Sequence, residues 1–333
     1  MLTVDKQDRA RRVASCRSYA AWILRDGSTV IQLSGNDRID LLHRLTTNDM
    51  RALEPGRGRQ TVLLTEKARM IDVVTLLQDK QEALLLGSQG TAADVLSWIR
   101  KYVIMDDVRL RDVTQQHAII EIMGPRAAEV VESLLDTPVK DLAMSQWRSI
   151  DDGLLVVRMP SASELSYWLV GSVQTLQTIR EQLVLHDDQI PELDSEIDEY
   201  VRVLAGMGRV GHEWTLAYNP LEAGLLHLTS FTKGCYIGQE VVARLDSYNK
   251  VKQRIMGLIA PSQVTPGDVI VADGNAVGVI TSAVAGFDAS QWFALGYVRG
   301  EFAHPGTSIG IEHSGLMITA DLVLPPMIDP SCP

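Results

Sequence analysis

The segment Ala118-Ile119-Ile120-Glu121-Ile122-Met123-Gly124-Pro125 predicts a buried strand followed directly by the start of a helix. Its first six residues are mostly apolar, and Gly124-Pro125 is a turn pair with proline where the first helical turn favours it. Beyond the turn, apolar residues recur at helical spacing and share one face: Ala127, Val130, Val131 and Leu134. The pattern therefore predicts a strand followed by an amphipathic helix.

Two further strands follow this pair, at Leu154–Met159 and Ser166–Val170, before a second helix that carries Val173, Leu176, Ile179 and Leu183. The resulting order β-α-β-β-α is close to the split βαβ, ferredoxin-like pattern, in which helices cover one face of an antiparallel sheet. We therefore expect an α+β lobe in this half of the chain.

The preceding part of the chain shows a similar succession. Residues 34–50 predict a capped amphipathic helix, and strands are expected at Thr61–Leu64, Met70–Leu77 and Ala83–Leu86. A helix capped by Thr91 then places Val95, Leu96, Ile99 and Val103 on one face. This order predicts a second ferredoxin-like lobe, so that residues 1–249 would hold two intertwined α+β lobes.

Helical periodicity is absent from residue 250 onward, where short β-rich runs alternate with turns such as Pro266-Gly267-Asp268 and Asp273-Gly274-Asn275. We expect a small C-terminal β-barrel over residues 250–329. Its predicted strands are Arg254–Ala260, Val269–Ala272, Ala276–Val284, Phe293–Val298, Ser308–Glu312 and Leu316–Val323.

Composition argues against several classes of protein. The 333 residues include 31 Lys and Arg against 42 Asp and Glu, a net charge of −11, without a basic stripe that would bind nucleic acid. Apolar runs stop far short of the roughly 20 residues that span a bilayer, so we expect no membrane partner. The N-terminus lacks a secretory apolar core, which predicts a cytoplasmic protein. The three cysteines, Cys16, Cys235 and Cys332, are too scattered for a disulfide framework or a CxxC metal site.

The densest concentration of chemistry lies in Asn219–Leu225 and Phe231–Glu240. Gly234 and Gly238 allow positive φ angles or close backbone approach, and the residues around them supply a charge, a thiol and hydrogen-bonding groups. A loop of this kind can present Cys235 to solvent.

The sequence Lys233-Gly234-Cys235-Tyr236-Ile237-Gly238-Gln239-Glu240 resembles the signature K-G-C-Y-x-G-Q-E of the YgfZ branch of the YgfZ/GcvT family of folate-binding proteins. The likeness extends over nearly the whole chain. It is supported by Leu45–Asp49, Pro55–Gly58, Pro220–Leu225 and Lys250–Arg254. The resemblance implies a three-lobed ring around a folate pocket, built from the two α+β lobes and the barrel, with tetrahydrofolate or a one-carbon derivative as cofactor.

The resemblance also implies folate-binding residues. Glu222 occupies the position of the glutamate that holds the pterin, and a carboxylate can accept two parallel hydrogen bonds from the ring's donors. Lys233 and Arg244 are candidate partners for the carboxylates of the folate tail, and Tyr236 is a further candidate folate contact. For Glu222, Lys233 and Arg244 the alternative is a charged side chain exposed to water.

Asp72 lies in a segment similar to the G-G-x-x-D-D-L stretch of glycine-cleavage aminomethyltransferases, where an aspartate acts on the folate. Ala68 and Arg69 replace the paired glycines, and Val73 replaces the second acid. Asp72 is therefore a candidate catalytic residue of a weakened site. The alternative is a strand residue on the solvent-facing side.

Cys235 is the second candidate catalytic residue. The alternative is a small buried apolar side chain, which is the usual state of a lone cysteine. In the resembled YgfZ branch the thiol is associated with assembly or repair of iron–sulfur enzymes, so iron–sulfur client or assembly proteins are the implied partners. One thiol cannot enclose a cluster that takes four ligands, so contact with a cluster would be transient or shared.

Two functions follow from these residues. The first is a tetrahydrofolate-binding accessory protein for iron–sulfur proteins, which would not be a conventional enzyme. The alternative is an aminomethyltransferase or demethylase in which Asp72 performs acid–base work. A third option is a protein that binds folate only as a structural or regulatory ligand.

Overall fold

A computed structural model describes residues 2–160, 162, 165–247 and 251–329. The chain forms two compact units. The two-sheet unit contains Ser15–Leu193 and Leu228–Gln239, and the barrel unit contains Met1–Ala14, Asp194–His227 and Glu240–Pro333. The predicted boundary between residues 249 and 250 lies outside the described residues, as do Lys250 of the Lys250–Arg254 motif and Cys332.

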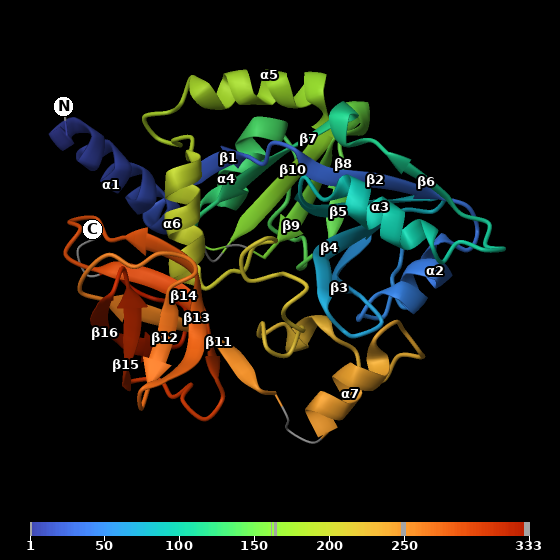
Figure 1. The fold of residues 1–333 in the computed structure, drawn as a ribbon. Helices are drawn as coiled ribbons and strands as arrows, with labels where there is room; N and C mark the ends of the chain where they lie inside the picture. Colours follow the sequence, from blue (N-terminus) through green and yellow to red (C-terminus); the bar gives the residue numbers. More distant parts are fainter. Residues whose placement is uncertain (1, 161, 163–164, 248–250, 330–333) are drawn as a thin grey trace. The chain divides into compact units, whose positions relative to one another are not determined.

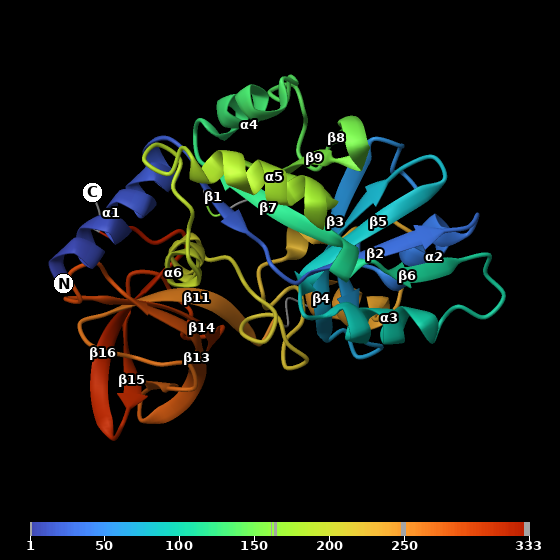
Figure 2. The ribbon, with the colours of Figure 1, turned by 90° about the horizontal axis from the view of Figure 1, so that it is seen from above.

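The first sheet of the two-sheet unit is antiparallel, with the strand order β1-β7-β10-β9-β8. Its strands are β1 (Ala21–Leu24), β7 (His117–Met123), β8 (Trp147–Ser149), β9 (Leu155–Met159) and β10 (Ser166–Ser172). Helices α4 (Ala127–Leu135) and α5 (Val173–Val184) pack on one face of this sheet (Figure 2). The predicted order β-α-β-β-α is confirmed by β7, α4, β9, β10 and α5.

The second sheet is also antiparallel, with the order β3-β4-β5-β2-β6. It consists of β2 (Ser28–Ser34), β3 (Arg57–Leu64), β4 (Met70–Gln78), β5 (Glu82–Gln89) and β6 (Arg109–Asp112), and α2 (Arg38–Leu45) and α3 (Ala92–Arg100) pack on it. The succession β6-β2-β5-β4 is the ferredoxin-like arrangement. Strand β3 starts at Arg57, inside the predicted turn Pro55–Gly58, because this edge strand pairs along its whole length with β4.

The two sheets face each other through a shared apolar core. Side chains that point away from the helices meet there: Val30, Leu77 and Leu86 from one sheet, and Ile119, Val157, Met159 and Val170 from the other. Successive side chains of a strand point to opposite faces of its sheet. The side chains on one face therefore contact the helices, and those on the other face contact the second sheet. The unit is therefore a four-layer α/β/β/α stack (Figure 1).

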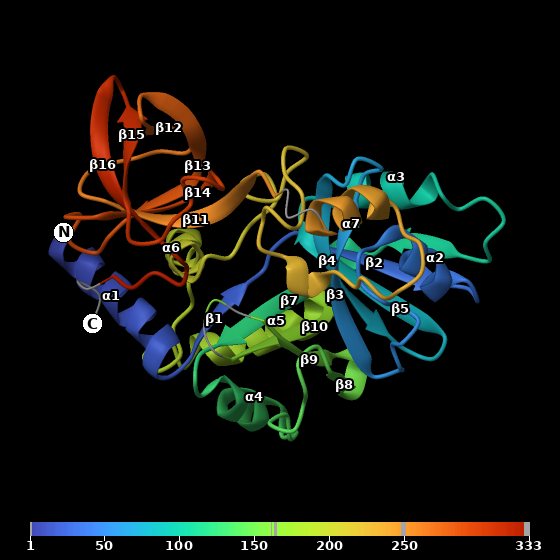
Figure 3. The same ribbon diagram turned by 90° about the horizontal axis from the view of Figure 1, so that it is seen from below.

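The barrel unit contains a closed six-stranded barrel with the order β11-β14-β13-β12-β15-β16 (Figure 3). The strands are β11 (Gln253–Ala260), β12 (Val269–Ala272), β13 (Asn275–Ala285), β14 (Trp292–Arg299), β15 (Ser308–His313) and β16 (Leu316–Val323). All six predicted strands are confirmed. Inward-facing apolar residues such as Met256, Leu258 and Val298 fill the interior. The α+β fold with a C-terminal β-barrel is thus the observed fold class.

Helix α6 (Ser195–Ala205) packs on β13 and β14 of the barrel. Two helices are not predicted by the sequence patterns, α1 (Leu2–Ser18) and α7 (Gln239–Ser247). The remaining short elements are the 3₁₀ turns Thr114–Gln116, Asp151–Gly153 and Leu226–Leu228. Helix α1 has almost no apolar stripe, which is why helical periodicity does not reveal it.

Candidate functional site

Glu222 sits in a tight turn of the barrel unit and is 5% exposed. The side-chain oxygen Oδ1 of Asn219 accepts from the N–H groups of Leu221 and Glu222, each at 3.0 Å, while Glu222 Oε2 accepts from the N–H of Asn219 at 3.1 Å. The N–H of Ile255 in β11 donates to the Glu222 carbonyl at 3.0 Å. Glu222 is thus a buried carboxylate on a turn tied to the barrel, and the alternative of a solvated side chain is wrong.

Tyr218, which precedes this turn, stacks on Tyr297 of β14. The rings of Tyr218 and Tyr297 lie 3.5 Å apart between centroids at an interplanar angle of 16°. Burial, and then the negative charge of Glu222, raise the pKa of Tyr218. Tyr297 is fully buried and its hydroxyl donates to the Glu213 carbonyl at 2.9 Å, whereas Tyr218 is only partly buried. Sequence reasoning missed both residues, although Tyr218 directly precedes the Asn219–Leu225 motif.

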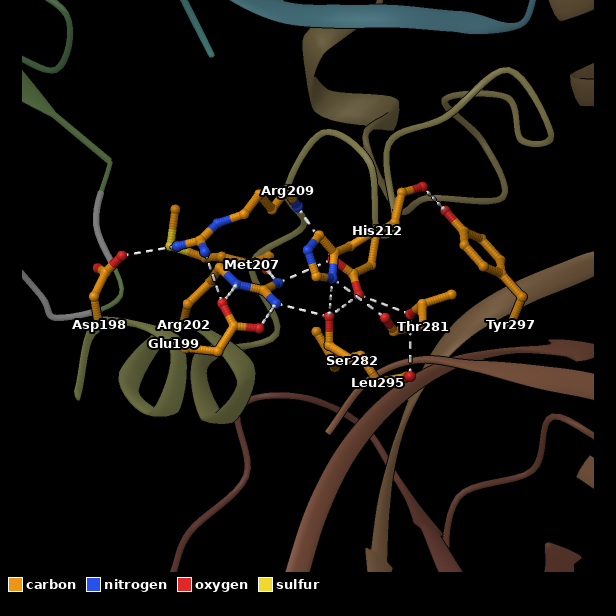
Figure 4. Close-up of polar contacts among 11 residues, drawn as sticks. Asp198, Glu199, Arg202, Met207, Arg209, His212, Thr281, Ser282, Leu295 and Tyr297 are labelled. Carbon is orange, nitrogen blue, oxygen red and sulfur yellow. Dashed lines mark hydrogen bonds and ion pairs between the residues drawn. The ribbon is translucent and has the colours of Figure 1, made fainter. Parts of the chain in front are cut away.

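A buried polar network supports the segment that leads into this turn (Figure 4). Glu213 is fully buried and accepts from Arg202 Nη1 at 2.9 Å, the N–H of Arg209 at 3.1 Å, and the hydroxyls of Thr281 and Ser282, each at 2.7 Å. Arg202 Nη2 also donates to Ser282 Oγ at 2.7 Å. Since Arg202 lies on α6 and Ser282 on β13, the network joins helix, loop and barrel.

Lys233 has a role that the sequence did not reveal. Its Nζ donates to the carbonyl oxygens of His43, Thr46 and Asn48 at 2.5, 2.7 and 2.6 Å. These carbonyls lie at and just beyond the C-terminus of α2, where backbone acceptors lack helical partners and a positive charge is favourable. Burial lowers the pKa of Lys233 to about 7. All three ammonium protons are used in this contact, and the predicted binding of a folate tail by Lys233 stays a prediction.

The loop around Cys235 is held on both sides of the thiol. Tyr236 is buried, its ring centroid lies 5.1 Å from Lys233 Nζ, and burial raises the pKa of its hydroxyl to about 12. The N–H of Ile237 donates to the carbonyl of Arg44 at 3.0 Å. Cys235 itself is exposed. The loop therefore presents the thiol outward, and the alternative of a buried cysteine is wrong.

Gly238 makes the close approach of this loop possible. Its φ is +81°, and a Cβ at this position would lie 2.9 Å from the carbonyl oxygen of Thr65 and 3.1 Å from the Cα of Ala68. Only glycine fits both the positive φ and the contact. The loop consequently rests directly on the turn between β3 and β4.

Asp72 lies on β4 and is fully buried, and its side chain reaches Thr91, the residue that precedes α3. Its Oδ1 accepts from the N–H of Val73 and from Ser88 Oγ, each at 2.7 Å. Its Oδ2 accepts from the N–H of Ser88 at 3.1 Å and from Thr91 Oγ1 at 2.6 Å. Burial raises the pKa of the carboxyl although these hydrogen bonds oppose the shift. The solvent-facing alternative for Asp72 is therefore wrong.

The candidates thus fall into three groups, each within one unit. Lys233, Cys235 and Tyr236 share one loop, and Asp72 belongs to a separate buried cluster of the same unit. Glu222 lies in the barrel unit, to which Arg244 also belongs as an exposed side chain of α7.

Metal ligands and membrane spans are not found among the described residues. No three His, Cys, Asp or Glu side chains among them gather closely enough to hold a metal ion. Within the same ranges, no helix has the length and apolar character needed to cross a membrane.

Known proteins resemble this chain in sequence and fold. The family model of the GCVT N-terminal domain matches residues 10–233, and that of the glycine cleavage T-protein C-terminal barrel domain matches residues 253–329. A chloroplastic protein of Arabidopsis thaliana whose name describes it as a transferase is 32% identical over 297 residues, which cover 86% of this chain and 67% of that protein. An aminomethyltransferase of Bacillus subtilis is 23% identical over 308 residues, covering 89% of this chain and 84% of the relative.

The crystal structure of glycine cleavage system aminomethyltransferase T from Bartonella henselae has the same fold. It superposes with a TM-score of 0.86 at 20% sequence identity, over 96% of this chain and 90% of the other. The N-terminal domain match spans most of the chain and the barrel match follows it, so the protein belongs to the glycine cleavage T-protein (GCVT) family.

Proposed function

We propose that the protein binds tetrahydrofolate, or a one-carbon derivative of it, and uses the Cys235 thiol to assist assembly or repair of iron–sulfur proteins. The observation that carries the proposal is the loop at residues 232–240, in which an exposed thiol stands between the buried Lys233 and Tyr236. The uninterrupted sequence K-G-C-Y-I-G-Q-E supports assignment to the YgfZ branch of the family.

The turn around Glu222 fits a pterin. A buried carboxylate is stabilised by each donor brought to it, and a pterin offers a ring N–H and an amino group side by side. The partly buried ring of Tyr218, which stacks on the buried Tyr297, adds apolar, polarisable surface close by. Bound tetrahydrofolate would supply a carrier for one-carbon units. Glu222 would orient it, and Arg244, Lys233 and Tyr236 are the further folate contacts that we propose.

The exposed position of Cys235 suits contact with another protein. A thiol that reaches solvent can attack, or ligate, a group held by a partner, whereas a buried thiol cannot. Iron–sulfur clusters are held by several thiolates, so Cys235 would act together with ligands of the client or assembly protein.

A matched pair of variants tests this division of roles. In a strain that lacks the protein, Cys235→Ala should fail to restore iron–sulfur enzyme activity, while the purified variant should bind tetrahydrofolate as the wild type does. Cys16→Ala, which removes a buried thiol, is the control and should restore activity. Full restoration by Cys235→Ala would overturn the thiol role.

Glu222→Gln tests the folate site separately, because it keeps the size of the side chain and removes its charge. We expect tetrahydrofolate binding to weaken roughly 10- to 100-fold, the value of a lost charge-assisted hydrogen bond. Unchanged affinity would remove Glu222 from the site.

The second candidate function is an aminomethyltransferase or demethylase. It is favoured by the aminomethyltransferase relatives and by the raised pKa of Asp72, since a general acid needs a pKa nearer to neutrality than that of a free aspartate. A coupled assay with an aminomethyl-loaded lipoyl carrier should then produce 5,10-methylene-tetrahydrofolate with release of ammonia, and Asp72→Asn should abolish it. Absence of product in the wild type counts against this function. Folate binding with no phenotype in the deletion strain would instead indicate a structural or regulatory ligand.

A further inference from the structure

His43 is a buried histidine beside the loop that carries Cys235. It lies on α2, is 3% exposed, and neither of its ring nitrogens has a hydrogen-bond partner among the described residues. Nδ1 lies 3.1 Å from Asp49 Oδ1, a separation that suits an ion pair with a protonated ring, but the two groups are not aligned for a hydrogen bond. Buried polar atoms are normally paired, so an imidazole with two unpaired nitrogens is unusual.

The backbone and the ring of His43 both meet the segment that leads to the thiol. The carbonyl oxygen of His43 accepts from Lys233 Nζ at 2.5 Å. Nε2 of the ring lies 3.9 Å from the position that a Cβ on Gly234 would take. The imidazole therefore lies next to the two residues that directly precede Cys235.

The charged groups that face the imidazole come from three segments. They are Lys233 of the loop, Asp49 and Arg51 of the segment after α2, and Asp40 of α2 itself. Burial, and then the positive charges of Lys233 and Arg51, lower the pKa of His43, and the two carboxylates oppose this shift. Since the pKa of Lys233 is about 7, Lys233 takes up its proton first as the pH falls, and His43 follows.

The carboxylates near His43 do not balance two buried cations. Asp40 is already paired with two arginine side chains. Asp49 therefore remains as the shared carboxylate of Lys233 and His43, and it favours the charged form of each. Because like charges repel and burial penalises each of them, a proton on His43 disfavours the charge on Lys233.

We propose that His43 is a positioning residue for Cys235, an inference that deepens the proposed thiol function and rests on it. While the ring is neutral, Lys233 holds the loop against the end of α2. When the ring takes up a proton, it attracts Asp49 and repels the ammonium group of Lys233, so the loop loses its anchor. The thiol is therefore held in place near neutral pH and released in acid.

The first test measures the pKa of His43 from the pH dependence of its imidazole signals in NMR of the full-length protein. In the wild type we expect a value below the ordinary 6.5. Lys233→Met should raise this pKa by about one unit, because a neighbouring cation is removed, and Asp49→Asn should lower it. Lys233→Gln, which keeps N–H donors for the carbonyls, is the second variant in case Lys233→Met does not fold. An unchanged pKa in the folded Lys233 variants would overturn the coupling.

The second test measures the rate at which 4,4′-dithiodipyridine modifies Cys235 between pH 5 and 8, with the modified residue identified by mass spectrometry. The thiolate attacks this disulfide, forms a mixed disulfide and releases a thiopyridone, and the reagent still reacts in acid. Each rate is divided by that of His43→Gln at the same pH, which removes the ionisation of the thiol itself. We expect this ratio to rise several-fold from pH 7.5 to pH 5 in the wild type. The control His186→Gln, which replaces an exposed histidine of the same unit, should show the same rise.

A ratio that stays constant from pH 7.5 to pH 5 would remove His43 from this role. A rise of the same size in Lys233→Gln would do so as well, because the proposed effect acts through the charge of Lys233. Neither test uses an iron–sulfur protein. If Cys235→Ala restores iron–sulfur enzyme activity while both tests give the expected results, the proposed function fails and the control of the loop by His43 stands.

Discussion

At the scale of single residues, the clearest structural role is that of Lys233. Its ammonium group closes the C-terminal end of α2 through three carbonyl oxygens, and it anchors the loop that carries Cys235. Burial makes the charged form of the Lys233 side chain less favourable, which is why the pKa of this group is lowered.

Lys233→Met should destabilise the protein by about 2 kcal/mol near pH 8, because buried carbonyls lose their donor. The destabilisation should depend on pH. The pKa of Lys233 is about 7 in the folded state and 10.5 ordinarily, so between these values the unfolded chain binds more protons, and the wild type gains stability as the pH rises. Urea unfolding at pH 6, 7.5 and 9 measures the difference in the free energy of unfolding between the variant and the wild type. If this difference became smaller as the pH rises, the role assigned to Lys233 would be contradicted.

Asp72 is the second residue whose environment permits a sharp prediction. Asp72→Ala should cost about 3 kcal/mol or more, since the buried donors of Ser88 and Thr91 lose their acceptor. The control is Asp94→Ala, an exposed aspartate in the first turn of helix α3, for which we expect a loss of about 1 kcal/mol or less. Thermal unfolding of the two variants distinguishes them. Equal losses would show that the Asp72 cluster contributes little.

At the scale of elements, the loop at residues 232–240 depends on backbone geometry as much as on side chains. Gly238→Ala should disturb it, because the new methyl group would meet the carbonyl oxygen of Thr65 at 2.9 Å. Gly56→Ala is a matched control, since Gly56 has a similar φ of +84° and no atom within 4 Å of the position that a methyl group would take. The control measures only the strain of positive φ, about 1–2 kcal/mol.

We expect Gly238→Ala to lower the free energy of unfolding more than Gly56→Ala does. We also expect Gly238→Ala to change the rate at which iodoacetamide alkylates Cys235. Chemical denaturation and mass spectrometry of the alkylated protein give the two readings. An unchanged alkylation rate together with equal destabilisation would show that the loop tolerates a shift away from β3 and β4.

At the scale of the whole molecule, the barrel unit is assembled from distant parts of the chain. Residues 194–227 supply Glu213, which accepts from Thr281 and Ser282, and Tyr218, which stacks on Tyr297. A fragment of residues 250–333 would leave these buried groups without partners. We therefore expect that fragment to show poorly dispersed amide signals in NMR, whereas a fragment of residues 194–333 should show dispersed barrel signals. Dispersed signals from residues 250–333 would contradict this dependence.

The amino-acid sequence was sufficient to predict the types of most elements and the α+β class. Strand and helix periodicities are local properties, so the two ferredoxin-like successions and all six barrel strands could be recognised from nearby residues alone. Helix α1 lacks an apolar stripe, so helical periodicity does not reveal it. Helix α7 begins at Gln239, inside the segment Phe231–Glu240 that was interpreted as a loop. The glycine-rich loop itself, with Cys235 at its centre, was also evident from residue types.

The environments of the functional candidates were decided by tertiary structure. Lys233 contacts carbonyls 185 to 190 residues away in the chain, and Tyr297 stacks on a tyrosine from a different segment. Burial of a charge, the partner of a hydrogen bond and the pKa that follows depend on which distant segments pack together, and no local pattern specifies that packing. The sequence alone thus determined which residues carry chemistry, while the fold determined that Glu222 and Asp72 are buried, that Lys233 closes a helix and that Cys235 faces solvent.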